Sequence, residues 1–245
     1  MTTQPGAHPL DTQLEPTLAE LESATQRYLR TIAGLEDARF ADPSVLPGWT
    51  VAHVIAHVAS NATGISRAVH AAEVGDHPWV YESNQSRDEE IDERAVWPVP
   101  ELRALNAKST DDIRAAFEGC PADILEVLLP RTIDGPEWSV ADWTGARWRE
   151  VEIHHTDLGV GYTHHDWNDT FVDYLLRVAV FDREPEISVT LRLPDGDVDI
   201  AGGGQVISGS KRDVVWWLIG RGGGAGVSSE EPLPELGPWA RRTRA

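Results

Sequence analysis

Apolar residues recur every three to four positions along four stretches in the first two thirds of the chain, a period that predicts amphipathic helices. The stretches cover residues 11–35, 50–65, 101–118 and 139–160. Pro98 and Pro100 precede the third stretch, and Gly159 and Gly161 mark the end of the fourth, as expected at helix boundaries. Thr50 is the expected N-cap of the second helix. Together these helices predict a bundle, preceded by a loose tail over residues 1–10.

The pattern changes after about residue 165. Residues 167–183 form one more helical stretch, and residues 186–193 then alternate between apolar and polar, as a strand does. Residues 194–197 predict a hairpin turn, followed by strands at 198–200 and 205–210 and a helix at 211–220. We therefore expect an α+β protein, with a four-helix bundle over residues 1–165 and a small α/β domain over residues 166–245.

Two segments between the predicted bundle helices have less defined patterns. Residues 82–94 are densely charged and include Arg87, and such a run is typical of a solvated surface. Residues 124–129 are apolar and predict a short strand or an extended link.

The charge of the chain limits its partners. It has 245 residues, with 21 basic and 40 acidic side chains and a formal charge of −19. This excess would repel phosphate backbones and anionic lipids, so we expect neither nucleic-acid nor membrane binding. An anionic small molecule would need local positive charge to bind, so any arginine in a pocket is a candidate for binding it.

Other features of composition point to an ordinary intracellular protein. A single cysteine, Cys120, excludes an internal disulfide framework and a cysteine-based zinc finger. No apolar run approaches the roughly 20 residues that span a bilayer, and the first 16 residues lack the pattern of a secretory signal. We expect a soluble, cytoplasmic monomer.

Candidate metal ligands lie in two of the predicted bundle helices. Glu150 and His154 are four residues apart, so a carboxylate and an imidazole leave one helix face together. Histidine and carboxylate are ligands that zinc accepts, and a catalytic zinc site has three protein ligands and an open position. Ninety residues upstream, the segment 53–57 begins and ends with histidine.

Spacing alone leaves the ligand set open. Glu152 and His155 form a workable i, i+3 pair, and His53 and His57 are themselves an i, i+4 pair. Plotted at about 100° per residue, His57 falls at the edge of the apolar stripe and His53 lies further into the polar side. His57 is therefore the better candidate. Ordinary surface pairs of glutamate and histidine would give the same pattern.

Two further groups could carry chemistry. The run His164–His165–Asp166 has metal-ligand residue types, but adjacent residues in a linker project in different directions. The glycine-rich segments 202–204 and 220–224 do not match the dinucleotide fingerprint or the phosphate loop and are expected to be turns. Arg221 lies within the second of them, where its guanidinium could bind a carboxylate or cap the preceding helix.

Residues 46–59, LPGWTVAHVIAHVA, resemble the helix-two signature of the mycothiol-dependent maleylpyruvate isomerase family, which belongs to the DinB-like metal-binding bundles. Later landmarks of that family are similar to segments of this chain in the same order. They are residues 86–91, 149–154, 157–159, 208–210 and 220–222. The resemblance covers nearly the whole chain and implies a DinB-like four-helix bundle with a small C-terminal α/β domain.

The resemblance also implies a set of functional residues. The family's zinc ligands correspond to His57, Glu150 and His154, and its catalytic arginine corresponds to Arg221. Arg87 is expected to help anchor an anionic substrate and is assigned to cofactor binding.

The implied reaction uses zinc and mycothiol. The open metal position would hold the mycothiol sulfur as a thiolate, because a coordinated thiol loses its proton at neutral pH. Addition of this thiolate to the cis double bond of maleylpyruvate, rotation and elimination would give fumarylpyruvate. The alternatives are a mycothiol S-transferase, which would leave a stable thioether, and a non-catalytic protein that binds a metal or small ligand.

Overall fold

The computed structural model describes residues 18–76 and 79–239. The described chain falls into two compact units, one ending at Thr163 and the other beginning at His164. The first is built mainly from helices and the second contains a four-stranded sheet, which confirms the predicted α+β class. No helix among the described residues is long and apolar enough to cross a bilayer. The predicted tail at residues 1–10 lies outside the described residues.

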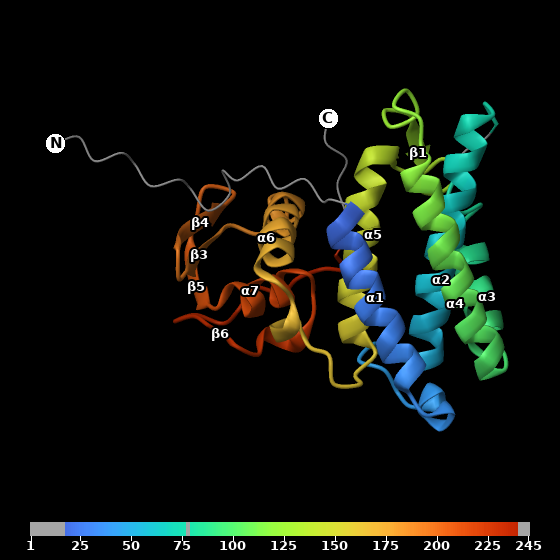
Figure 1. The fold of residues 1–245 in the computed structure, drawn as a ribbon. Coiled ribbons are helices and arrows are strands. Elements are labelled where there is room, and N and C mark those ends of the chain that lie inside the picture. The colour runs from blue at the N-terminus through green and yellow to red at the C-terminus, as the bar shows by residue number, and fades with distance from the viewer. Residues whose placement is uncertain (1–17, 77–78, 240–245) are drawn as a thin grey trace. The chain divides into compact units, whose positions relative to one another are not determined.

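The first unit contains five α-helices, seen in blue to yellow in Figure 1. They are α1 (Leu18–Gly34), α2 (Val51–Glu73), α3 (Asn84–Ala95), α4 (Val99–Glu118) and α5 (Val140–Asp157). Helix α1 packs against α4 and α5, and α2 packs against α3, α4 and α5. All four predicted helices are present, although residues 11–17 of the first lie outside the described part of the chain.

Helix α2 shows how the sequence sets both the start and the orientation of a bundle helix. The Thr50 side chain accepts a hydrogen bond from the backbone N–H of His53, as predicted for the N-cap. The His53 side chain in turn accepts one from the backbone N–H of Thr50, which closes a capping box. The predicted apolar stripe is fully buried at Val51, Val54 and Ile55, and most other positions of α2 are buried too, because α3, α4 and α5 all pack against it.

The charged segment 82–94 is largely a helix, α3, which the sequence interpretation did not identify. Ser83 caps it by accepting a hydrogen bond from the backbone N–H of Ser86. Ile91 is its one buried residue among those described, and it faces inward while most of the charged side chains remain on the surface. The expectation of a solvated face thus holds for most of the segment, while Ile91 and a hydrogen bond of 2.7 Å from Arg94 to Ser60 hold it against α2.

A short hairpin joins α4 to α5 and also fixes the segment before α3. Strand β1 (Leu128–Pro130) pairs with β2 (Glu137–Ser139) in antiparallel register. The backbone N–H groups of Val80 and Tyr81 donate to the carbonyls of Pro130 and Arg131, at 3.0 and 2.8 Å. This places Tyr81 firmly against the bundle.

The second unit contains a mixed sheet and two helices. Its α-helices are α6 (Asp169–Arg183) and α7 (Lys211–Leu218), and its strands are β3 (Val189–Leu193), β4 (Gly196–Ile200), β5 (Gln205–Gly209) and β6 (Val227–Ser228). The strand order is β4-β3-β5-β6, with β3 and β5 parallel and the other pairs antiparallel. The predicted turn at 194–197 joins β3 to β4, and β6 is an addition to the predicted elements.

Candidate metal centre

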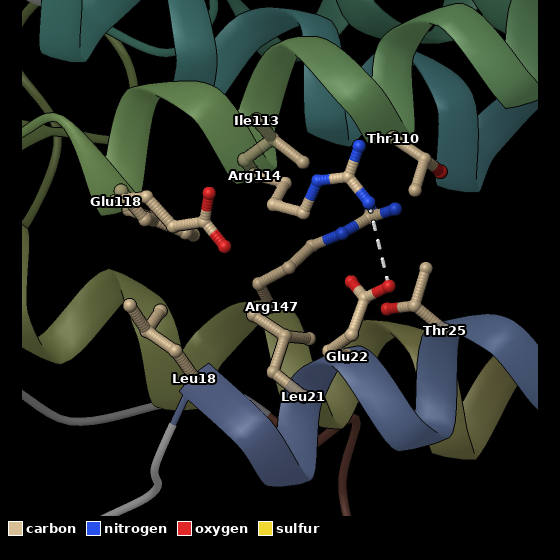
Figure 2. A pocket seen from close by; sticks show the side chains of 10 residues that line it. Leu18, Leu21, Glu22, Thr25, Thr110, Ile113, Arg114, Glu118 and Arg147 are labelled. Carbon is tan, nitrogen blue, oxygen red and sulfur yellow. Dashed lines mark hydrogen bonds and ion pairs between the residues drawn. The ribbon is translucent and has the colours of Figure 1, made fainter.

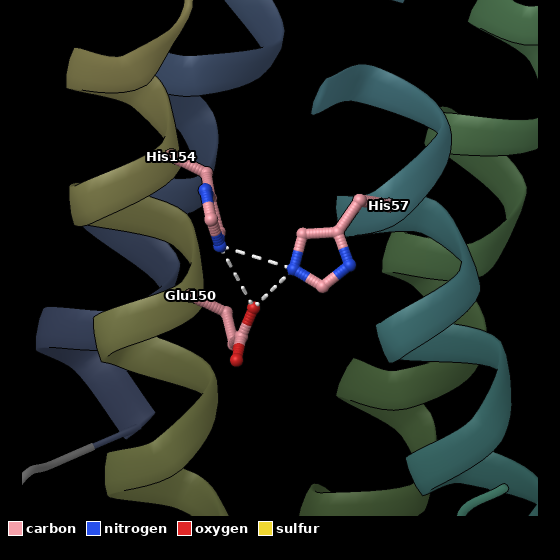
Figure 3. Close-up of side chains that lie close together, drawn as sticks. All are labelled: His57, Glu150 and His154. Atoms are coloured by element: carbon pink, nitrogen blue, oxygen red, sulfur yellow. Dashed lines mark hydrogen bonds and ion pairs between the residues drawn. The ribbon is translucent and has the colours of Figure 1, made fainter. Parts of the chain in front are cut away.

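Three side chains from two bundle helices meet at one point between α2 and α5 (Figure 3). His57 Nε2 lies 2.9 Å from Glu150 Oε2 and 3.0 Å from His154 Nε2. His154 Nε2 lies 3.3 Å from the same Glu150 oxygen. The structure therefore brings together the three residues expected as ligands, although they are 93 and 97 positions apart across the two helices.

Helical geometry explains this convergence. Glu150 and His154 are one turn apart on α5, so both side chains leave the same face. That face is turned toward α2, where His57 lies at the edge of the buried stripe and is 4% exposed. The Glu150 side chain is 30% exposed, so the cluster is also open to solvent on one side.

The three facing atoms are spaced as ligands of a single metal ion. Ligand atoms about 2.0–2.1 Å from zinc at tetrahedral angles lie roughly 3.3 Å from one another. The observed separations of 2.9, 3.0 and 3.3 Å are close to this value. Two imidazole nitrogens and a carboxylate oxygen are also a donor set that zinc accepts, with one position left for another ligand. The residues fit a catalytic divalent metal.

Without a cation, the cluster distributes protons unevenly. Burial lowers the pKa of His57 to about 4, assisted by the charge of His154 and opposed by Glu150. Burial also disfavours a charged His154, but hydrogen bonds to Asp157 and Glu150 outweigh it and raise its pKa to about 9. For Glu150, burial disfavours the charged form, but the electrostatic interaction with His57 and the hydrogen bonds to both histidines outweigh it and hold the pKa well below its usual value. At neutral pH His154 therefore carries a proton that a metal ion would have to displace.

The second nitrogen of each histidine has its own partner. His154 Nδ1 lies 2.9 Å from Oδ2 of Asp157, whose side chain is fully buried. A carboxylate in this position orients a ligand histidine and increases its basicity. His57 Nδ1 lies 3.2 Å from a guanidinium nitrogen of Arg87, so the predicted anion-binding arginine is at the edge of the cluster. Arg87 also pairs with Asp88 at 2.5 Å.

Sequence reasoning missed a group of polar residues beside the cluster. Tyr81 is 5% exposed, and the guanidinium carbons of Arg87 and Arg131 lie 5.9 and 5.6 Å from the centre of its ring. Burial and the charge of Glu150 raise the pKa of Tyr81 to about 12, so its hydroxyl stays protonated at neutral pH. No local pattern marks Tyr81, because it lies in an irregular segment that is held by the hairpin through Arg131, 50 residues further on in the sequence.

Arg147 is a second missed residue. Its guanidinium is 1% exposed and donates to the Val58 carbonyl at 2.7 Å and to Asn61 Oδ1 at 2.9 Å. These bonds join α5 to α2 one and four residues beyond His57. The sequence showed Arg147 only as a charge on a helix, and its burial depends on the tertiary packing of that helix.

The alternative ligand pairs do not join the cluster. His53 is occupied at the helix cap, with Nδ1 2.7 Å from Thr50 Oγ1. Glu152 and His155 point toward α1, where Glu152 pairs with Arg27 at 2.5 Å and His155 contacts Thr31 at 2.8 Å.

Comparison with known proteins agrees with this geometry. Residues 21–159 match the family described as the mycothiol maleylpyruvate isomerase N-terminal domain. The chain belongs to this family. A crystal structure of the mycothiol-dependent maleylpyruvate isomerase is similar over 95% of this chain and 100% of that one, with 29% identity and a TM-score of 0.82. A histidine-to-alanine mutant of that enzyme gives the same TM-score at 28% identity. None of the curated proteins compared with the chain matches it.

In this family member, the expected catalytic arginine belongs to the second unit. Arg221 follows α7 between Gly220 and Gly222, which have φ values of +77° and +66°. Its backbone N–H donates to the Trp216 carbonyl at 3.0 Å. Glycine adopts such left-handed conformations readily, so the chain can reverse direction on both sides of Arg221. The catalytic role of Arg221 stays a prediction.

A separate pocket in this isomerase-family bundle lies between α1, α4 and α5 (Figure 2). It has about 380 Å³ of empty volume, including space open to solvent, and is lined by residues such as Leu21, Ile113 and Arg147. An ion pair of 3.5 Å joins Arg114 to Glu22 at its wall. None of the three clustered residues lines it, so it is distinct from the candidate metal centre.

Proposed function

We propose that this protein is a zinc-dependent isomerase that uses mycothiol to convert maleylpyruvate to fumarylpyruvate. The observation that carries the proposal is the meeting of His57, Glu150 and His154 within 3.3 Å of one another in a chain of this family. The similar crystal structure is that of a mycothiol-dependent maleylpyruvate isomerase, which supports the same substrate and cosubstrate here.

The three clustered residues would hold the metal. Zinc bound there would supply a Lewis acid that keeps the mycothiol sulfur deprotonated at neutral pH. Glu150 is already ionised and His57 already neutral near pH 7, so both are ready to act as ligands. His154 must give up its proton, and Asp157 accepts a hydrogen bond from Nδ1 so that Nε2 presents its lone pair.

The proposed isomerisation forms and breaks one carbon–sulfur bond. The mycothiol thiolate adds to a carbon of the cis double bond, and its electron pair moves the alkene electrons onto the carbonyl oxygen as an enolate. The former double bond is now single and can rotate. When the enolate collapses, the sulfur leaves with its electron pair, and the trans product and the thiolate are released.

Positive side chains would stabilise the negative charge of this reaction. Arg87 adjoins His57 at 3.2 Å and would bind a substrate carboxylate. Arg221 would bind a second carboxylate or the enolate oxygen, where charge accumulates in the transition state. The ring centre of the buried Tyr81 lies 5.9 Å from the guanidinium carbon of Arg87, and its hydroxyl remains protonated at neutral pH, so Tyr81 would add no negative charge beside this arginine.

The test is an assay of cis-to-trans conversion with zinc-loaded protein, with and without mycothiol. We expect turnover only with mycothiol and full recovery of the free thiol at the end. Turnover that is unchanged without mycothiol would reject the proposal. A stable thioether would identify a mycothiol S-transferase instead, and zinc and mycothiol binding without any product would identify a binding protein. We also expect a cytoplasmic monomer, which cell fractionation and gel filtration would test.

A further inference from the structure

A second group of potential metal ligands lies within the C-terminal unit. His164 and His165 belong to the 3-10 turn η2 (His164–Asp166), and Asp213 lies in the first turn of α7. One ligand atom from each of the three lies within 4.8 Å of the others. His164 Nε2 is 3.0 Å and His165 Nε2 is 3.7 Å from the same oxygen of Asp213, Oδ1.

The Asp213 carboxylate is held in place by its surroundings. Its other oxygen, Oδ2, accepts a hydrogen bond from Ser210 Oγ at 2.5 Å, which fixes the side chain at the start of α7. Gly226, at φ +83°, packs so closely over Asp213 that an added Cβ would lie 2.5 Å from the carboxylate carbon. Oδ1 is thereby directed toward the two histidines.

The basic residues next to Asp213 do not neutralise it. Lys211 pairs with Asp173 and Asp195 at 2.6 and 2.5 Å, and Arg212 donates to the Trp167 carbonyl and to Asp169. Among the described residues, the ion pairs of Asp213 are those with the two histidines. The carboxylate therefore depends on imidazoles, or on an ion between them, for its charge balance.

His164 is supported by aromatic rings. It stacks on Trp216 with a centroid distance of 5.2 Å and an interplanar angle of 5°, and Trp167 meets it edge-on at 6.1 Å. One hydrogen bond to Asp213 would explain His164 alone, but it does not explain why His165 turns its Nε2 toward the same oxygen. Side chains at adjacent positions usually diverge, and the 3-10 turn brings these two rings to 4.0 Å of each other.

From these contacts we propose that His164, His165 and Asp213 form a second divalent transition-metal site, independent of the bundle centre. Separations of 3.0 and 3.7 Å lie on either side of the roughly 3.3 Å expected between zinc ligands. The donor set is again two imidazoles and one carboxylate. The sequence alone offered no reason to expect a site at the run of residues 164–166, because adjacent residues in a linker usually diverge. The structure brings Asp213 to the two histidines from 48 residues beyond His165.

Metal at this site would tie η2 to α7. Trp216 lies under His164, and its backbone carbonyl accepts the N–H of Arg221 at 3.0 Å. Its indole also lies so close to Gly222 that an added Cβ there would approach within 2.7 Å. An ion held by His164 would therefore stiffen the turn that carries Arg221, in addition to joining the two elements.

The test is calorimetric titration of the full chain with Zn²⁺, with metal content measured after removal of weakly bound ions. In a Glu150→Gln/His154→Ala background, which disables the bundle centre, we expect one zinc per chain to remain. His165→Ala in that background should weaken the remaining site at least tenfold. Asp213→Asn should do the same, because asparagine keeps an oxygen for Ser210 but lacks the charge.

His70→Ala is the matched control, because His70 is an exposed histidine beside Glu73 and should leave zinc binding unchanged. His165 is similarly exposed, with 61% of its side chain accessible, so its loss should not prevent folding, which circular dichroism would verify. Absence of zinc from the background variant would overturn the proposal. Zinc binding that persists unchanged in His165→Ala and Asp213→Asn would also overturn it.

Discussion

Helix α5 carries two glutamate–histidine pairs on different faces, and the comparison between them shows what distinguishes a metal centre from an ordinary buried contact. Glu150 and His154 face α2, whereas Glu152 and His155 face α1. Both pairs lie within one helix of 18 residues; Glu152 and His155 are buried, whereas Glu150 and His154 are partly exposed.

The difference lies in the partners. Glu152 is bound by the cation of Arg27 at 2.5 Å and by the hydroxyl of Tyr162 at 2.6 Å. His155 lies 2.8 Å from Thr31 Oγ1 and stacks on Tyr162 with a centroid distance of 3.7 Å. These partners supply the protons and the positive charge that a buried carboxylate requires.

Around Glu150, the facing atoms are nitrogens of histidines that can themselves act as metal ligands. The two carboxyl groups respond oppositely. Burial raises the pKa of Glu152 despite its partners, whereas the histidines hold that of Glu150 well below its usual value. The proposed metal centre thus differs from the other pair in two ways: its nitrogen and oxygen atoms converge on one point, and among the described residues no lysine or arginine forms an ion pair with Glu150.

The largest effect should come from replacing the Glu150 carboxylate by an amide, compared with the same replacement of Glu152 on the other face of α5. Glu150→Gln removes the charged ligand, so zinc content should fall close to zero and isomerase activity by more than about a hundredfold, beyond the usual effect of losing an outer partner. Glu152→Gln is the matched control and should keep its zinc. Metal analysis and the cis–trans assay on both variants would decide. Equal zinc loss in the two would remove the distinction between the faces.

A smaller effect is expected one contact away from the ligands. Asp157→Asn weakens the acceptor of the His154 Nδ1 proton, so zinc affinity should decrease by about 10- to 100-fold. Competition with a chelator would measure the change. Asp92→Asn is a suitable control, because Asp92 is exposed and lies 3.9 Å from His53. An unchanged affinity in Asp157→Asn would show that this carboxylate only packs the helix.

The pH dependence of zinc binding provides a third test. The pKa of His154 is about 9 and that of His57 about 4. Between pH 4 and pH 9, zinc should therefore displace one proton, which is the proton on His154. Apparent affinity should therefore rise about tenfold per pH unit from pH 5 to 8 and level off above pH 9. Calorimetry in buffers of different ionisation enthalpy should show release of close to one proton at pH 7. Zero release would contradict the proton distribution.

The smallest effect is expected on the α1 side. Thr31→Val removes the hydroxyl that contacts His155, and the free energy of unfolding should decrease by about 1 kcal/mol. Zinc content and affinity should not change. Urea denaturation would measure the stability, with Thr31→Ser as the control that retains the hydroxyl. A loss of zinc in Thr31→Val would show that the two faces of α5 are coupled.

Much of the helical unit could be predicted, because its signals are local. The period of apolar residues located α1, α2, α4 and α5, and Thr50 marked the start of α2. Helix α3 was not predicted because Ile91 is its single buried residue, and one apolar residue does not form a periodic stripe.

The site could be predicted only in part. Spacing identified Glu150 with His154 as one pair among several, and family resemblance indicated the set with His57 that the structure brings together. Glu152 looked equally suitable because its partners, Arg27 and Tyr162, meet it only after folding. For the same reason no pattern around His164 indicated Asp213. The spacing of apolar residues along the chain does not show which distant segments come into contact after folding. These contacts determine which glutamate or aspartate is available to a metal.

The most direct measurement is the absorption spectrum of the cobalt-substituted protein during titration with mycothiol. We expect His165→Ala protein to bind one Co²⁺ in the bundle centre, and mycothiol to produce a new near-ultraviolet sulfur-to-cobalt charge-transfer band that saturates at one mycothiol per chain. Glu150→Gln in the same background should show no such band. A spectrum that mycothiol leaves unchanged, or an identical band in Glu150→Gln, would contradict a thiol-binding metal held by His57, Glu150 and His154.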